Sequence, residues 1–362
     1  SVKTTPLDAA ELIRSGNKIF NAARSEVKHN RSELMDAGIK NWDKKTREFI
    51  DYWFLPDTQI ELLALREQIR QIKNPMIKDF FDLAFSATII TKSGGVSLAF
   101  DLGHTRPHRA KVVIANGNRI EIARNLSKFS SQRIEILTKH IRSALDEFNK
   151  KYKQNLKGII GKSSGFIPPD IRLADAQAMP LKDNSIDLIV TSPPYASNAI
   201  DYMRAHKFSL IWMGYPIHAL GEKRGEYIGG EATKDFDFEK LPDYTAKIVA
   251  DLCKTDLKRG QILHRYYSEM IRVLREMFRV LRPGRSAIVV VGSSILKGKD
   301  TQTGNCLGDI GQTIGFEIPK IGIRNLHRDK RMMPSGKKLD LDSQIQQRMH
   351  QEFVIGFYKP ES

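Results

Sequence analysis

The fold of this 362-residue chain is decided at residues 186–195, which read IDLIVTSPPY. The first five residues form a short apolar run typical of a buried strand, and a polar loop from Thr191 to Tyr195 follows directly. In an open α/β sheet, ligands bind beyond the carboxyl ends of the strands, so this loop lies where a site is expected. Two consecutive prolines hold φ at about −65° and lack an N–H donor, so the loop is stiff and presents its carbonyl groups.

The chemistry of this loop suits the binding of a flat, extruded base. The Ser192 hydroxyl and the Pro193 carbonyl can accept hydrogen bonds from an exocyclic amine, while the Tyr195 ring can stack on the base. A structural role is the alternative, because Pro-Pro-Tyr can also simply end a strand.

Strand and helix patterns alternate around the loop from about residue 170 onward. Helical patterns cover 196–214 and 264–281, and a polar segment predicted to be rich in loops lies at 214–258. This alternation predicts an α/β fold with a mostly parallel sheet and helices on both faces. The predicted strands lie at 170–176, 186–190, 286–294, 314–325 and 350–359.

The N-terminal region has mainly helical patterns, with a short β-type stretch between them. Helical patterns cover 57–72, with Asp57 or Thr58 as the cap, and 74–90. Short β-type runs follow over 96–122, where Asn116-Gly117 predicts a hairpin turn. A long amphipathic helix is expected over 130–152. We therefore divide the chain into a helical and β-hairpin region, 1–165, and an α/β domain, 166–362.

The charge balance predicts a polyanion as partner. The chain has 58 Lys and Arg against 42 Asp and Glu, which gives a net charge of +16. Nucleic acid is the favoured partner, and a solvated basic surface is the alternative. Two basic clusters are expected to contact phosphates or base edges. The first contains Arg106, His108, Arg109 and Lys111 beside His104, and the second contains Arg328, Lys330 and Arg331 beside Arg324 and His327.

Other sequence features exclude several classes of protein. Two cysteines, Cys253 and Cys306, cannot form a four-cysteine zinc site or a disulfide framework, and no metal site is expected. This cysteine usage indicates a reducing, cytoplasmic setting. The first residues do not read as a signal peptide, and no run of about 18 apolar residues predicts a membrane span.

Two longer stretches carry a family resemblance. LADAQAMPLKDNSIDLIVTSPPY at 173–195 and VLREMFRVLRPGRSAIVVVGSS at 273–294 resemble the amino-methyltransferases, which methylate exocyclic nitrogens of DNA bases. The match covers about 170–295 and continues more weakly to 358. Residues 1–165 are similar to the insertion in one subgroup of large bacterial DNA methylases. The resemblance implies a Rossmann-like methyltransferase sheet, S-adenosylmethionine as cofactor, DNA as partner, and a bacterial or archaeal source.

The resemblance also implies roles for the loop residues. Ser192 and the Pro193 carbonyl would bind the target amine, Pro194 would shape the turn, and Tyr195 would stack on the flipped base. The first motif position is Asp or Asn in most adenine-type enzymes and often Ser in cytosine-type ones. Ser192 therefore favours cytosine N4 over adenine N6. No Pro-Cys pair is present to supply the covalent nucleophile of ring-carbon methylation.

The cofactor side of the site is expected to be incomplete. Asp175, with Ala176 beside it, matches the position that contacts the adenine amino group of the cofactor, and Thr191 is also expected to bind the cofactor. The glycine-rich turn that the family places after its first strand is not found, and Gly158 to Ser163 reads as a linker. The start of the chain, VKTTPLD at 2–8, resembles the segment that follows this turn. We therefore expect a second polypeptide or an N-terminal segment to supply the glycine-rich cofactor loop.

Three functions are compatible with this pattern. The first is a DNA amino-methyltransferase subunit or fragment, and the second is an RNA or protein methyltransferase on the same fold. The third is a catalytically silent DNA-binding subunit that keeps the fold without the cofactor turn.

Overall fold

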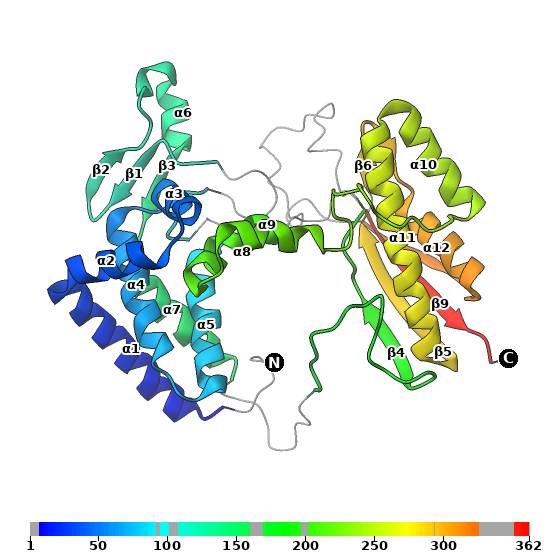
Figure 1. Cartoon of the computed structure of the whole chain (residues 1–362), viewed down its shortest axis with the longest axis horizontal. Coiled ribbons are helices and arrows are strands. Elements are labelled where there is room, and N and C mark those ends of the chain that lie inside the picture. The colour runs from blue at the N-terminus through cyan, green and yellow to red at the C-terminus, as the bar shows by residue number, and fades with distance from the viewer. Residues whose placement is uncertain are drawn as a thin grey trace. The chain divides into compact units, whose positions relative to one another are not determined.

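The structure is a computed structural model that consists of two compact units (Figure 1). The N-terminal unit contains Ser1–Ile171 and Tyr202–Gly221, and the C-terminal unit contains Arg172–Asp201 and Glu222–Ser362. Residues 202–221, which the sequence places in the α/β domain, thus pack with the N-terminal unit. The structure describes residues 7–91, 95–100, 108–159, 169–196, 202–292, 294–325 and 351–361.

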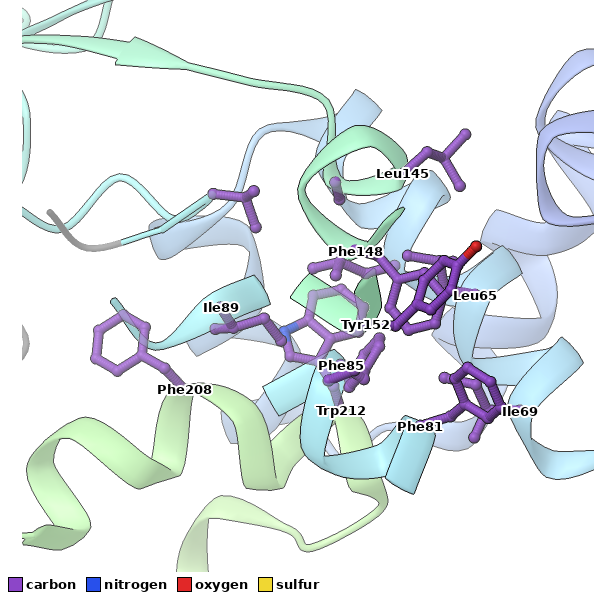
Figure 2. Packing of buried hydrophobic residues seen from close by; sticks show 14 of the residues in the cluster. Leu65, Ile69, Phe81, Phe85, Ile89, Leu145, Phe148, Tyr152, Phe208 and Trp212 are labelled. Atoms are coloured by element: carbon purple, nitrogen blue, oxygen red, sulfur yellow. The ribbon is translucent and has the colours of Figure 1, made fainter. Parts of the chain in front are cut away.

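Helices dominate the N-terminal unit. In Figure 2, aromatic side chains of α5 and α7 point toward one another, and the ring centroids of Phe81 and Tyr152 lie 5.9 Å apart. Phe208 and Trp212 join the same core from the segment that returns to this unit. The α-helices are α1 (Ala9–His29), α2 (Arg31–Asn41), α3 (Lys44–Trp53), α4 (Pro56–Arg70), α5 (Pro75–Ile89), α6 (Ser131–Ile136), α7 (Ala144–Lys157), α8 (Tyr202–Leu210) and the first part of α9 (Ile217–Gly225), and the 3₁₀ helices are η1 (Leu126–Lys128) and η2 (Ile211–Met213).

A small three-stranded sheet accompanies these helices. Its order is β2 (Asn118–Glu121), β1 (Val112–Ala115) and β3 (Thr138–Ile141). Asn116 and Gly117 have φ values of 51° and 77°, which confirms the predicted hairpin turn between β1 and β2. The single helix expected over 130–152 is wrong, because β3 interrupts it to pair in parallel with β1. Helix α7 is a separate helix that begins after β3, with Ser143 as its N-cap.

The start of α4 also differs from the prediction. The helix begins at Pro56, and Leu55 is its N-cap without a side-chain hydrogen bond. Asp57 lies inside the first turn, where its carboxylate pairs with Arg31. Proline favours the first helical position because its missing N–H would have no partner there.

The C-terminal unit contains a four-stranded sheet. Its order is β4 (Ile186–Thr191), β5 (Leu281–Gly292), β9 (Gln351–Lys359) and β8 (Ile321–Asn325), and a short hairpin joins β6 (Ile295–Leu296) to β7 (Lys299–Asp300). Strands β4 and β5 pair in parallel, whereas β9 pairs antiparallel with both β5 and β8. Three strands thus run in one direction and β9 runs against them, so the sheet is mixed.

One face of this sheet is covered by helices α11 (Leu257–Val280) and α12 (Thr303–Ile314), and α10 (Asp243–Thr255) packs against these two helices. Val289 of β5 and Phe357 of β9 are fully buried beneath them. The other face carries Leu188 and Val190 of β4, which are 59% and 67% exposed. Helices on both faces, as expected from the sequence, are therefore not found in the described part of this unit. Helix α10 itself lies in a segment predicted to be rich in loops.

No helix in the described ranges is both long and apolar enough to cross a membrane.

Candidate active site at the end of strand β4

The start of β4 is fixed by the end of α11. The guanidinium of Arg279 donates hydrogen bonds to the Met179 carbonyl at 3.0 Å and to the Asp183 carboxylate at 2.6 Å. The Ser185 N–H donates to the Val280 carbonyl at 2.8 Å. These contacts hold the chain just before β4, and pairing with β5 then places the end of the strand.

The loop leaves β4 at the carboxyl edge of the sheet, as the sequence predicts. Thr191, the last residue of β4, lies opposite Val289 of β5 in the parallel register. Ser192 is exposed, and Pro193 and Pro194 are half-buried. The loop thus combines an accessible hydroxyl with a rigid, partly covered backbone, which suits the binding of a polar group from outside.

Tyr195 is held on two sides. Its hydroxyl donates to Oε1 of Glu352 at 3.0 Å, and the second oxygen of Glu352 pairs with Arg324. Its ring lies against Gly292, where an added Cβ would approach two ring carbons to 2.6 Å. Glu352 and Gly292 are not among the residues predicted from the sequence. A glycine that ends the apolar run VVVG is a visible signal for a close approach, whereas nothing near Glu352 in sequence marks it.

A buried hydroxyl lies near this loop. Tyr266 of α11 is fully buried, and its hydroxyl has no hydrogen-bond partner in the described part of the chain. Burial, together with the neighbouring Tyr195, raises the pKa of its phenol well above the ordinary value. Tyr266 therefore stays a neutral hydroxyl.

The proposed cofactor residues Asp175 and Ala176 lie in an exposed turn, where Asp175 accepts a hydrogen bond from the Gln177 N–H at 2.9 Å. The strand expected over 170–176 is not formed, and Ile171 and Leu173 of this segment are exposed. A strand needs a neighbour for its backbone groups. Among the described residues, no strand pairs with this segment.

The first basic cluster lies in the N-terminal unit. An isolated antiparallel bridge pairs Arg109 with Ala99, and the neighbouring His108 is exposed. The guanidinium of Arg109 lies 4.1 Å from the Tyr52 ring centroid, and the ammonium of Lys111 lies 5.4 Å from that of Phe129. Both cations are thus partly engaged by rings of their own unit. Arg106, Arg328, Lys330 and Arg331 lie outside the described residues.

Neither cysteine has the properties of an activated nucleophile. Both are free thiols, and burial raises the pKa of Cys253 and raises that of Cys306 to about 11. A thiol with a raised pKa is poorly ionised at neutral pH, and the thiolate is the reactive form. Among the residues that the structure describes, no group of three or more His, Cys, Asp or Glu could hold a metal ion.

Comparison with known proteins finds methyltransferases, the class of enzyme that the loop motif resembles. No family model matches the chain. The type II methyltransferase M.MvaI of Kocuria varians is 24% identical over 313 residues, which cover 82% of this chain and 62% of that protein. Over most of its length, this chain is thus similar in sequence to a type II methyltransferase. M.BsoBI of Geobacillus stearothermophilus is 21% identical over 243 residues, which cover 58% of this chain and 47% of M.BsoBI. The chain therefore spans only about half to two thirds of the length of these two relatives.

Solved structures show a fainter likeness. TTHA0409 of Thermus thermophilus, assigned as a DNA modification methylase, has 18% sequence identity over 52% of this chain and 55% of that chain, in a complex with S-adenosyl-L-methionine. The TM-score is 0.27, which is too low to decide the fold of this chain.

Proposed function

We propose that this methyltransferase relative carries the catalytic loop of an enzyme that transfers a methyl group from S-adenosylmethionine to the exocyclic amine of a flipped DNA base. The observation that carries the proposal is the Thr-Ser-Pro-Pro-Tyr loop, which lies at the carboxyl end of β4 with Ser192 exposed. The relationship to type II methyltransferases and the net charge of +16 support DNA as the substrate.

The residues of the loop would act on the amine itself. The amine lone pair is delocalised into the base, so transfer requires a nitrogen that becomes pyramidal and gains positive charge. The Ser192 hydroxyl and the Pro193 carbonyl would accept hydrogen bonds from its two N–H groups and stabilise that charge. Pro194 would keep the Pro193 carbonyl in place, and Tyr195 would stack on the base. Bound S-adenosylmethionine would supply the electrophilic methyl group.

Cytosine N4 is the favoured target. Ser192 stands where most adenine-type enzymes of the resembled family have Asp or Asn. Ring-carbon methylation of cytosine needs a thiolate nucleophile, and burial raises the pKa of both cysteines. An exocyclic amine, which needs no covalent enzyme intermediate, fits these residues better.

The cofactor half of the site would come from outside the described residues, in a Rossmann-like sheet that continues beyond β4. The outer edge of β4 has no partner strand in the described part of the chain, and Leu188 and Val190 beside it are exposed. M.MvaI extends well beyond the matched region, which covers 62% of its length. We therefore propose that a strand ending in a glycine-rich turn, from a second polypeptide or an N-terminal segment, pairs with β4. Asp175, Ala176 and Thr191 would then contribute this chain's share of the cofactor contacts.

A catalytically silent DNA-binding subunit is the second candidate. The missing glycine-rich turn and the exposed, non-strand position of Asp175 favour it. DNA contacts by the two basic clusters are expected under both functions.

Substitution of the loop residues separates the two candidates. We expect Ser192→Ala and Tyr195→Ala each to reduce methyl transfer to DNA by roughly 100-fold or more, because amine acceptors and base stacking are lost. DNA binding should survive. Ser185→Ala is the matched control, since its hydroxyl bonds only the Lys182 carbonyl before β4. Transfer by both loop variants at the wild-type rate would contradict the proposal.

A further inference from the structure

Residues from four parts of the C-terminal unit meet at the end of the sheet. Gly292 closes β5 and lies opposite Glu352, near the start of β9. Arg324, near the end of β8, lies opposite the same Glu352 on its other side. Tyr195 reaches this point from the loop after β4. The antiparallel direction of β9 thus brings an acidic residue to the edge that carries the proposed catalytic loop.

Glu352 is buried, with 8% of its surface exposed, and its two carboxylate oxygens have different partners. Oε1 accepts the hydrogen bond from the Tyr195 hydroxyl at 3.0 Å, and Oε2 pairs with the guanidinium of Arg324. A buried carboxylate is tolerated only when such partners replace water. The orientation of Tyr195 therefore depends on the ion pair between Glu352 of β9 and Arg324 of β8, two strands that are distant from Tyr195 in sequence.

The contact with Gly292 restricts Tyr195 further. A tyrosine ring has two rotatable side-chain bonds, and the backbone at Gly292 limits the ring on one side. The hydrogen bond to Glu352 fixes the hydroxyl end. The packing contact with Gly292 and the hydrogen bond to Glu352 together restrict the orientation of the ring. A ring with a fixed orientation can hold a stacked base in one position.

We infer that Glu352 is a positioning residue for methyl transfer: it sets the orientation of the Tyr195 ring against the target base, and Arg324 holds Glu352 in place. The inference rests on the proposed function. It assigns to the site two residues, Glu352 and Arg324, that lie outside the Thr-Ser-Pro-Pro-Tyr motif. Loss of the hydrogen bond between Tyr195 and Glu352 would leave the base bound but less well oriented. We therefore expect kcat to fall more than the affinity for DNA.

The test uses methyl transfer to unmethylated DNA by the chain together with the segment that completes its cofactor site. We expect Glu352→Ala to lower kcat roughly 10- to 100-fold, the worth of a hydrogen bond to a charged group, with little change in KM for DNA. Tyr195→Phe, which removes only the hydroxyl, should lower kcat to a similar extent. The double variant should be no slower than either single one. Glu352→Gln should retain part of the activity, because its side-chain carbonyl can still accept the tyrosine hydroxyl while its amide N–H group cannot pair with Arg324.

Glu239→Ala is the matched control. Glu239 is an ion-paired carboxylate of the same unit, bonded to Arg272 and Arg275. Its loss should lower stability and leave kcat unchanged. Wild-type kcat in Glu352→Ala, or independent effects in the double variant, would overturn the inference and leave the proposed function standing. Absence of transfer by the wild type would defeat the proposed function and the inference with it.

Discussion

At the scale of the residue, Lys139 shows how burial alters a charge. It lies on β3 with 6% of its surface exposed, and its ammonium donates to the Ser97 carbonyl at 2.6 Å. Burial lowers the pKa of Lys139 to about 7. Between this value and the ordinary lysine pKa, the folded chain binds fewer protons than the unfolded chain. Stability should therefore rise with pH across this window and fall as the pH drops toward 7.

Substitution of Lys139 tests this linkage. The free energy of unfolding, measured with urea from about pH 7 to pH 9, should rise with pH in the wild type, and the rise should be smaller in Lys139→Met. Lys150→Met is the control, since Lys150 is an exposed residue of α7. Equal slopes in Lys139→Met and the wild type would show that the buried lysine does not control the pH dependence.

Individual site residues differ in how far the sequence reveals them. Ser192 to Tyr195 could be predicted because the motif is contiguous and follows an apolar strand. Glu352 could not, because it lies 157 residues from Tyr195 and meets it only through the order of the strands. A hydrogen bond of this kind depends on strand register, which short-range sequence patterns do not specify.

At the scale of the element, β4 has an exposed face and an outer edge that pairs with no strand in the described part of the chain, and we propose that a further strand pairs there. We expect Leu188→Lys to leave the stability of this chain within about 0.5 kcal/mol of wild type, because the side chain is already exposed. The same change should weaken association with the segment that completes the cofactor site. The measurement is urea unfolding of the chain alone, combined with co-purification of the completing segment.

Ile323→Lys serves as the control for that change. Ile323 is 61% exposed on β8, at the opposite edge of the same sheet. It should retain the association. Equal association by Leu188→Lys and the wild type would show that β4 is not the pairing edge.

The predicted elements failed where neighbours, rather than local pattern, decide the structure. Residues 130–152 have helical spacing, yet pairing with β1 makes a strand of Thr138–Ile141. Residues 170–176 have strand character, yet they form no strand among the described residues. In both cases a β-strand depends on a partner, whereas the local sequence gives only a preference. The helical pattern at α5 was correctly predicted, whereas α11 begins at Leu257 rather than His264 and β5 begins at Leu281 rather than Ser286.

At the scale of the whole molecule, the charge and the matched length both bear on the proposed function. The net charge of +16 suits DNA as the partner, and the relatives extend beyond the region that this chain matches. The resemblance predicted the methyltransferase relationship from two contiguous stretches. The division of the chain into units was harder to foresee, because residues 202–221 return to the N-terminal core through Phe208 and Trp212.

The most direct test of the central claim is to identify the methylated product. The chain, alone and coexpressed with the coding region immediately upstream of it, is incubated with isotopically labelled S-adenosylmethionine and unmethylated DNA. The DNA is then digested to nucleosides for mass spectrometry. We predict labelled N4-methylcytosine from the coexpressed assembly and none from the chain alone. Absence of any labelled exocyclic amine in DNA from the assembly would contradict the proposed function, and full activity of the chain alone would contradict the incomplete cofactor site.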